Sequence, residues 1–473
     1  MNLLRKRSSM LFMVVLVVTV LMGSMIVHAE KLRVVSSISG GKTTEESELF
    51  AKEVGEALGL EVEWIRPSGD EYLQTALRSG EHFDLIYLNT PFMDQLVDQG
   101  ALLPLTDFIK NSPILSDPAV IPTDDWEMIR YPDGHIYSVF NKYEGGTLPT
   151  VRADWLEKLG LEVPQTLDDF YNVLKAFVEQ DPDGNGINDT YGVTTAGLYD
   201  IQGFMGAFDV KARYVIDEDG RRTIPYASDA AIPAFEWMNM LYSEGLLDPN
   251  FVTNSSADMR NLFLADRVGM VTYWDMWVGL FNSMRLQEDP NTEFRAMGIA
   301  GPEGPNGERI LRRGDPSIWA IPANAQNPEG AKKFLEFWHT EAGIILGSVG
   351  IKGHDYIVKE DGTMELTEIG TTHNMDHGVP RWYNTNVKAP FGTLPGVTES
   401  EVFVNAYATL EISTADWPRA EAIVNDYSFR AITGQMTAEA AVKIEVILGA
   451  TGDAEAAVKK MHEELLAARL IDY

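Results

Sequence analysis

The sequence predicts an α/β protein built from two lobes, and three observations support this prediction. The chain has 473 residues, which is more than a single domain usually holds. Its N-terminal part alternates strand-like and helix-like patterns, as is typical of a mostly parallel sheet covered by helices. A second strand–helix pattern returns at Ser317–His339 after a long mixed region. Two lobes joined by several crossing segments explain this order better than two domains in tandem.

The first lobe begins with strands and helices in alternation. Apolar runs or period-two alternation predict the strands, and apolar residues three or four apart predict the helices. Strands are expected at Leu32–Ser37, Leu60–Ile65 and Phe83–Leu88, with helices at Glu45–Leu58 and Glu71–Arg78. Ligands of such sheets bind beyond the carboxyl ends of the strands, which points to Ser36–Gly41 and Asn89–Phe92.

The later elements follow the same signals. Strands are expected at Tyr131–Phe140, with a Pro-Asp-Gly-His turn inside that segment, and at Tyr191–Thr195, Arg267–Thr272 and Ser317–Ile321. Helices are expected at Trp155–Gly160, Leu167–Glu179, Ala230–Glu244, Pro328–His339, Val402–Leu410, Ala420–Ile432, Ala438–Ile447 and Ala454–Ala468. Gly- and Pro-containing stretches at Asn141–Thr150 and Gly301–Gly314 are expected to cross between the lobes.

These crossings divide the chain into expected lobes. We assign residues 30–142 plus about 312–355 to the N-terminal lobe, and 143–311 plus about 356–440 to the C-terminal lobe. Residues 441–473 are expected to form C-terminal helices.

Residues 1–29 have the pattern of a secretory signal peptide. A charged start at Arg5–Arg7 precedes an apolar run, Met10–Met22, and Val27–Ala29 has small residues at the cleavage positions. The alternative is an uncleaved anchor, because the 18 residues Met10–Val27 approach the length of about 20 that a membrane span needs. Cleavage would leave 444 residues (473 − 29) and a formal net charge of −35 (−32 − 3).

The charge and the absence of cysteine restrict the setting and the partners. A net charge of −32 argues against nucleic acid and anionic membranes as partners, and it suits divalent cations. A chain with no cysteine forms no disulfide and has no lipobox cysteine for lipid attachment. We therefore expect an exported, soluble, periplasmic protein that is a monomer.

The stretch Asp181–Asp189 reads Asp-Pro-Asp-Gly-Asn-Gly-Ile-Asn-Asp and has the spacing of an EF-hand calcium loop. Oxygen side chains occupy loop positions 1, 3, 5 and 9, and a glycine that permits the sharp turn occupies position 6. The predicted calcium ligands are Asp181, Asp183, Asn185, the carbonyl of Ile187, and Asp189.

One EF-hand ligand is missing from this loop, because position 12 is Gly192 instead of glutamate. A helix is expected before the loop and a strand after it, which favours a structural ion over a sensor that opens on binding. The alternative is a solvated turn rich in Asp and Asn, which the composition also favours.

Aromatic residues cluster at the end of the expected strand Arg267–Thr272. Aromatic faces stack on the apolar C–H faces of sugar rings, whereas core packing is the alternative role. The candidate aromatic contacts are Tyr273, Trp274, Trp277, Trp319, Trp382 and Tyr383. Polar neighbours suited to hydroxyls or a carboxylate are Asp275, Asn89, Arg313 and Asp315. Arg312 and Arg313 would suit a uronate, although arginines are more often surface residues.

Other catalytic and nucleotide-binding motifs are incomplete or absent. Gly41-Lys42-Thr43 lacks the glycine that a phosphate loop needs five places earlier, where Ser36 stands. His373 and His377 have the spacing of a zinc-protease helix without its glutamate. No Gly-x-Ser-x-Gly nucleophile turn occurs, and no catalytic acid pair is singled out among 70 carboxylates.

Four stretches together resemble the family 1 extracellular solute-binding proteins of ABC importers, especially the large oligosaccharide-binding subgroup with lipoprotein-type and alginate-oligosaccharide-binding members. They are Phe83–Ile86, Val151–Leu156 with the Asp181–Gly192 loop, Arg267–Met270, and Phe429–Gln435. The resemblance implies a periplasmic-binding-protein fold (type II-like) with an interlobe cleft and crossing hinge strands. It also implies a structural calcium in the loop, although some relatives have a glutamate where Thr190 stands.

The resulting functional hypothesis is a non-catalytic receptor that captures a carbohydrate by lobe closure and delivers it to membrane permease subunits of an ABC importer. The alternatives are a receptor for a peptide or another small solute, a secreted carbohydrate-active enzyme, and a sensory protein that presents its ligand to a membrane kinase. Composition and charge do not name the sugar.

Overall fold

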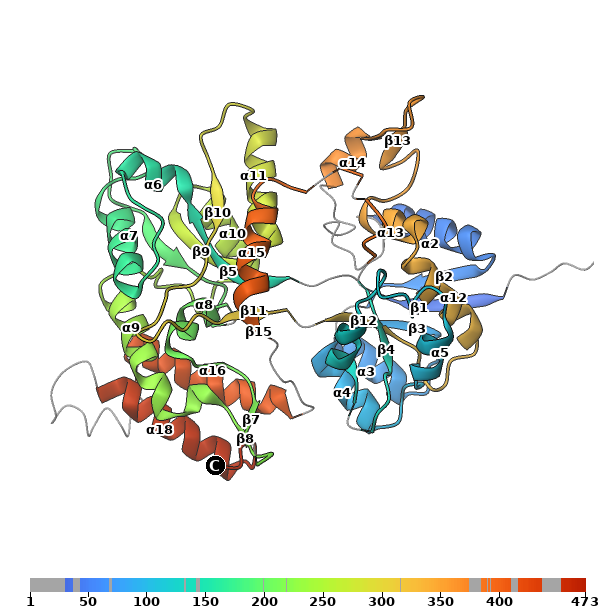
Figure 1. Cartoon of the computed structure of the whole chain (residues 1–473), viewed down its shortest axis with the longest axis horizontal. Helices are drawn as coiled ribbons and strands as arrows, with labels where there is room; N and C mark the ends of the chain where they lie inside the picture. The colour runs from blue at the N-terminus through green and yellow to red at the C-terminus, as the bar shows by residue number, and fades with distance from the viewer. Residues whose placement is uncertain are drawn as a thin grey trace, which may run out of the picture.

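The computed structural model describes residues 30–36, 43–67, 70–131, 133–141, 145–198, 200–217, 219–314, 316–373, 384–388, 390–391, 393–409, 416–435 and 452–473. Figure 1 shows two α/β bodies side by side, joined by thin connecting segments. The two-lobed α/β architecture expected from the sequence is therefore confirmed. No helix in the described ranges is long and apolar enough to cross a membrane.

The first lobe is built on a five-stranded sheet with the order β2-β1-β3-β12-β4. Strands β1 (Lys31–Val35), β2 (Glu61–Ile65) and β3 (Leu85–Asn89) are parallel, as the strand–helix alternation predicts. Strand β12 (Ser317–Ala320) returns from far along the chain and runs antiparallel to both β3 and β4 (Ser138–Phe140). The sheet is therefore mixed, and its second half depends on residues distant in sequence.

Helices cover this sheet, and their local sequence explains where they begin and end. Helix α2 (Thr44–Leu58) starts at a capping box between Thr43 and Glu46 and ends at Gly59, which has a left-handed backbone (φ 69°). The other helices of this lobe are α3 (Asp70–Arg78), α4 (Thr90–Asp98), α5 (Thr106–Asn111), the 3₁₀ helix η1 (Thr123–Ile129), α12 (Pro328–Trp338) and α13 (Glu341–Ser348).

The strand expected at Tyr131–Phe140 is shorter in the structure and covers only Ser138–Phe140. The preceding residues form a turn, because Asp133 Oδ1 accepts a hydrogen bond from the amide of His135 at 2.9 Å. Gly134 in this turn has a left-handed backbone (φ 85°). The turn expected inside this segment is therefore present, and it limits the regular strand to the last three residues.

The second lobe has a six-stranded sheet with the order β15-β11-β5-β9-β6, with β10 paired to β5. Its strands are β5 (Gly146–Arg152), β6 (Tyr191–Thr194), β9 (Val268–Trp274), β10 (Ala296–Gly298), β11 (Leu311–Arg313) and β15 (Ala408–Thr409). The expected crossing at 141–150 is therefore shorter, because residues 146–150 already belong to the central strand β5. Pro149 hid this strand from sequence analysis, since a proline normally argues against a central strand.

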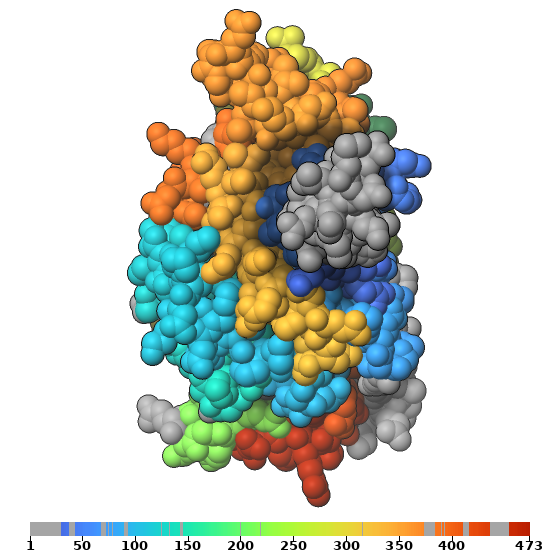
Figure 2. Space-filling view, turned by 90° about the vertical axis from the view of Figure 1, so that its right-hand side faces the viewer, coloured from blue at the N-terminus to red at the C-terminus, as the bar shows by residue number. Residues whose placement is uncertain are grey.

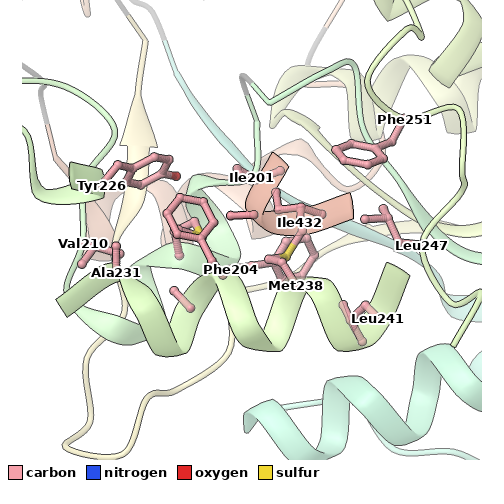
Figure 3. Packing of buried hydrophobic residues seen from close by; sticks show 14 of the residues in the cluster. Ile201, Phe204, Val210, Tyr226, Ala231, Met238, Leu241, Leu247, Phe251 and Ile432 are labelled. Carbon is pink, nitrogen blue, oxygen red and sulfur yellow. The ribbon is translucent and has the colours of Figure 1, made fainter. Parts of the chain in front are cut away.

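The core of the second lobe lies between this sheet and a helical layer. Phe204, Met238 and Ile432 come from α8 (Gln202–Met205), α9 (Ile232–Ser243) and α16 (Trp417–Thr433), and they pack together in Figure 3. The remaining elements are α6 (Ala153–Leu159), α7 (Leu167–Glu179), α10 (Ser256–Leu264), α11 (Met276–Glu288), α15 (Val397–Tyr407), α18 (Gly452–Ala467), β7 (Val215–Ile216), β8 (Arg222–Thr223), η2 (Gly206–Phe208), η3 (Pro225–Ala227) and η4 (Asp229–Ala231).

The segment that follows residue 355 lies close to the first lobe. Strands β13 (Tyr356–Val358) and β14 (Met364–Leu366) and helix α14 (Glu368–His373) stay with the first lobe, where Figure 2 shows them in orange. Asn384 still donates to the carbonyl of His339 at 2.8 Å, and the amide of Thr385 donates to Ala119 in the same lobe. The chain next joins the second lobe at α15, which packs against α11 and β5.

The C-terminal helix α18 packs against α9 and α16. Buried Met461 and Leu465 of α18 belong to the core cluster that α9 and α16 also form. The helix expected at Ala438–Ile447 lies outside the described residues, as does the segment 1–29.

Candidate functional site

The crossing segments bring one end of the second sheet next to the first lobe. Residues 141–145 lead from β4 into β5, and residues 314–316 lead from β11 into β12. In the register, Thr147 of β5 pairs with Trp274 of β9 on one side and with Arg312 of β11 on the other. The aromatic cluster at the end of β9 therefore lies at the edge of the second lobe nearest the crossings.

Trp274 is half-buried and lies against the backbone of the crossing. A Cβ atom added at Gly314 would overlap the six-membered ring of Trp274. Only glycine therefore lets the chain pass this close to the ring. The contact links the orientation of Trp274 to the path of the crossing at 314–316.

Tyr273 and Trp277 form a second aromatic group with Arg260. The Tyr273 hydroxyl accepts a hydrogen bond from Nη1 of Arg260 at 2.9 Å, and Cζ of Arg260 lies 4.3 Å from the Trp277 ring centroid. Tyr273 is only 8% exposed, whereas Trp277 is half-buried. Of the aromatic residues expected here, Trp274 and Trp277 therefore offer more surface to a ligand than Tyr273.

The side chains of Asp275 and Trp319 are buried inside their lobes. Asp275 is fully buried, and its Oδ1 accepts from the amide of Met276 at the start of α11. Trp319 is also fully buried in the first lobe, where its Nε1 donates to Asn141 Oδ1 at 3.0 Å. Both side chains lie in the core of this structure, and sugar contact at these two residues stays a prediction.

The remaining candidates are only partly described. Arg313 is half-buried on β11, opposite Gly146. Asn89 ends β3 and pairs with Ser317, which places its backbone at the edge of the first sheet that leads into the crossing. Trp382, Tyr383 and Asp315 lie outside the described residues, so their part in the site stays a prediction.

Asp200 is a buried carboxylate that sequence analysis did not single out. It is 1% exposed, and neither carboxylate oxygen has a hydrogen-bond partner in the part of the chain that the structure describes. Burial raises the pKa of its carboxyl to about 7, and the nearby charge of Arg312 partly opposes this rise. No local sequence motif marks Asp200, because its charged neighbour Arg312 lies on β11, far away in the sequence.

The Asp181–Asp189 loop follows α7 and precedes β6, as the sequence predicts. Its side chains turn inward onto the loop backbone. The amides of Asn185 and Gly186 donate to the Asp181 carboxylate at 3.0 and 2.9 Å, and Nδ2 of Asn185 donates to Asp183 at 2.8 Å and to Asp189 at 3.1 Å. Gly184 and Gly186 both have left-handed backbones, which the tight curl requires.

The chemistry of this loop suits a hard cation. Three carboxylates, an amide oxygen and a backbone carbonyl are the ligand types that calcium prefers. Burial and the neighbouring carboxylates of Asp181 and Asp189 raise the pKa of Asp183, and a cation would offset this accumulated negative charge. Within the described ranges, however, no group of three or more His, Cys, Asp or Glu side chains is already arranged to hold a metal.

Tertiary contacts explain two features of the loop that the sequence left open. A Cβ atom at Gly192 would come within 2.8 Å of the carbonyl oxygens of Leu174 and Leu246, so position 12 has no room for a glutamate. The second feature is the partner of Asp189, which is Arg267. Nη1 of Arg267 donates to Oδ2 of Asp189 at 2.6 Å, and Nη2 donates to the carbonyl oxygen of Asp189 at 2.8 Å. Arg267 thereby also lowers the pKa of the Asp189 carboxyl.

Comparison with known proteins places these features in a family. The sequence pattern of the family described as bacterial extracellular solute-binding protein matches residues 40–344. Lipoprotein LipO of Bacillus subtilis (strain 168) is 27% identical over 320 residues, which is 64% of this chain and 62% of LipO. The chain thus matches about three fifths of the length of this curated relative.

Two solved structures share the fold over nearly the whole chain. The alginate-binding protein AlgQ2, in a crystal structure without calcium ion, superposes with a TM-score of 0.65 at 19% identity, covering 92% of this chain and 97% of AlgQ2. The substrate-binding protein Lmo0181 of Listeria monocytogenes, in complex with cycloalternan, gives a TM-score of 0.67 at 16% identity, covering 94% and 100%. At these identities the similarity establishes the two-lobed binding-protein fold.

Proposed function

Because this chain belongs to the bacterial extracellular solute-binding proteins, we propose that it captures an oligosaccharide between its lobes and delivers it to an ABC importer. The family is one of binding proteins, and the proposal assigns no catalytic step to the chain. The names of AlgQ2 and of the Lmo0181 complex, which refer to alginate and cycloalternan, support a carbohydrate as the ligand class.

The observation that best supports a sugar is the aromatic edge of the second lobe. Trp274 ends β9 where the crossings enter the lobe, Trp277 lies in the first turn of α11, and both are half-buried. Half-buried aromatic rings give a sugar an apolar face to stack on, while nearby polar groups bind its hydroxyls. Closure of the first lobe over this edge would bury the ligand, as hinge-type binding proteins do.

The crossing segments allow such closure. Only thin connections join the two bodies in Figure 1, and each lobe has its own hydrophobic core. A ligand that contacts both lobes would bind the closed state more tightly and shift the population toward it. Delivery then requires membrane permease subunits that recognise the closed form. No nucleic acid enters this proposal, and a monomer suffices.

We also propose that the Asp181–Asp189 loop holds a structural calcium ion. Asp181, Asp183, Asn185, Asp189 and the carbonyl of Ile187 would be its protein ligands. The ion would neutralise the loop carboxylates and fix the connection between α7 and β6, away from the aromatic edge. The reference to calcium in the description of AlgQ2 supports this proposal.

Export is part of the same proposal. The family is extracellular, and the N-terminal pattern of the sequence is that of a secretory signal. We propose that the protein acts outside the cytoplasmic membrane, in the periplasm, in a form without a lipid anchor. LipO, by contrast, is named a lipoprotein.

A thermal-shift screen with neutral and acidic oligosaccharides, in excess calcium, tests the proposed function. A ligand at 100 times its dissociation constant stabilises the native state by about 2.7 kcal/mol, which shifts the melting temperature of a chain of this size by a few degrees. A day-long incubation with each hit, followed by analysis of the sugar, should return it intact. A degraded sugar would favour the enzyme alternative, and stabilisation only by peptides would favour a peptide receptor.

A further inference from the structure

Arg260, on helix α10, is a half-buried arginine held between two aromatic side chains. Its Cζ atom lies 4.3 Å from the ring centroid of Trp277 and 5.7 Å from that of Tyr273. Its Nη1 donates to the Tyr273 hydroxyl at 2.9 Å. Stacking holds the planar guanidinium in one orientation, so less side-chain entropy is lost when it binds a partner. The arginine is therefore fixed at the aromatic edge of the second lobe.

Among the described residues, Arg260 has no acidic partner, whereas several other buried or half-buried arginines of this lobe have one. Arg152 is paired with Asp154 and Asp266, Arg267 with Asp189, and Arg285 with Asp266. Among the residues that the structure describes, no carboxylate forms an ion pair with Arg260, although the chain has 70 acidic residues. Its Nε and Nη2 have no hydrogen bond there either, and they are not enclosed by protein atoms.

An oriented guanidinium with free donors is suited to a planar anion. Two parallel N–H groups of arginine match the two oxygens of a carboxylate, which makes the pair both stronger and more directional than a neutral hydrogen bond. The location favours the ligand as the source of this carboxylate, because Trp277, on which Arg260 stacks, is one of the two rings proposed to contact the sugar.

We propose that Arg260 recognises a carboxylate of the ligand, and that the ligand is an oligosaccharide containing uronic acid residues. This inference rests on the proposed function and names the substrate class of the same site. The net charge of the protein gives a second, electrostatic argument for a positive group at the site. A protein with a net charge of −32 repels an acidic sugar, so binding one requires a fixed positive group at the site. Arg260 supplies such a group beside the rings.

Titration calorimetry with three ligands of equal length tests the inference: a uronate oligomer, a neutral oligomer and a sulfated oligomer. Wild type would be compared with Arg260→Gln, Arg260→Lys and the control Arg295→Gln. Arg295 is a suitable control because it belongs to the same lobe but is exposed and paired with Glu157. Melting temperatures measured without ligand would show whether each variant folds.

We expect wild type to bind the uronate oligomer most tightly, with an affinity that falls as salt is added. Arg260→Gln should weaken uronate binding by about tenfold or more, since a charge-assisted hydrogen bond is lost. The uronate affinity of Arg260→Lys should lie between those of wild type and Arg260→Gln, because lysine keeps the positive charge but lacks the two parallel N–H groups of arginine. Arg295→Gln should bind as wild type, and any binding of the neutral oligomer should not change with Arg260, which would show that Trp277 is still in place.

Unchanged uronate affinity in Arg260→Gln would overturn the inference. A wild-type protein that binds only the neutral oligomer would also overturn it. In either case the proposed function, capture of an oligosaccharide, would stand. Arg260-dependent binding of the sulfated oligomer alone would replace the carboxylate by a sulfate ester and overturn the uronate assignment. Absence of binding to all three sugars would instead contradict the proposed function itself, and with it this inference.

Discussion

Trp319 donates its indole Nε1–H to Oδ1 of Asn141 at 3.0 Å, across 178 residues of sequence. Trp338 donates to the same oxygen. Asn141 is the last described residue before the crossing into the second lobe, and its amide donates to the carbonyl of Ser317 at 2.9 Å. Through its side-chain oxygen and its backbone N–H, the buried Asn141 thus connects the crossing to the aromatic core of the first lobe.

The first prediction concerns this connection. Asn141→Leu keeps the side-chain volume but leaves two buried indole donors unpaired, which should lower the free energy of unfolding by about 2–4 kcal/mol. Urea denaturation of the first lobe measures this loss. Asn324→Leu, at an exposed asparagine of the same lobe, is the control and should change stability by less than about 0.5 kcal/mol. Equal losses in the two variants would show that the Asn141 hydrogen bonds contribute little.

The second prediction concerns Trp274 and Gly314. Trp274→Ala should weaken oligosaccharide binding by more than about tenfold, because a buried aromatic anchor is lost. Gly314→Ala should also weaken binding, since the added Cβ would displace the Trp274 ring. Calorimetric titration measures both. Trp319→Phe is the control, because a core tryptophan should change the melting temperature without changing affinity. Wild-type affinity in Trp274→Ala would remove this residue from the site.

The third prediction concerns the calcium loop. Chelation by EDTA should lower the melting temperature by several degrees, because a bound ion stabilises only the folded state. Asp183→Asn should lower the melting temperature in excess calcium and have little effect in EDTA. Asp217→Asn, at an acidic turn between β7 and β8, is the control and should be insensitive to calcium. If calcium left the wild-type melting temperature unchanged, the loop would be a hydrogen-bonded turn.

The fourth prediction concerns Asp200, whose carboxyl has a pKa raised by burial from 3.8 to about 7. The folded protein holds this proton more tightly than the unfolded chain does, so the contribution to stability is complete at low pH and is lost as the pH rises through 7. Asp200→Asn cannot ionise and should therefore be more stable than wild type near pH 8, by on the order of a few kcal/mol. This advantage should disappear near pH 4.

Denaturation at several pH values, with exposed Asp219→Asn as a control, checks the Asp200 prediction. The control should follow wild type at every pH, because an exposed carboxylate has no desolvation cost. A loss of stability in Asp200→Asn near pH 8 would instead show that the attraction to Arg312 exceeds the cost of burial.

Local sequence predicted those features that depend on neighbouring residues. Apolar spacing predicted a helix at Glu45–Leu58, where α2 spans Thr44–Leu58, and it predicted Leu167–Glu179, which are the observed bounds of α7. The Asp–Asn–Gly spacing of the 181–189 loop likewise gives a tight inward curl, because glycines at fixed positions permit the left-handed turns. The aromatic residues at the end of β9 and the start of α11 are neighbours in sequence, so their clustering was visible for the same reason.

Only the tertiary structure decided which of these side chains a ligand can reach and which groups meet. Trp319 and Trp274 both lie in strands, yet Trp319 is fully buried by packing against Trp64, Phe334 and Trp338, whereas Trp274 is half-buried beside the crossing. Long-range contacts also joined Arg260 to Trp277, Arg312 to Asp200, and residues 384–385 to the first lobe. Burial and electrostatic pairing depend on residues brought together by folding, and no local pattern records them.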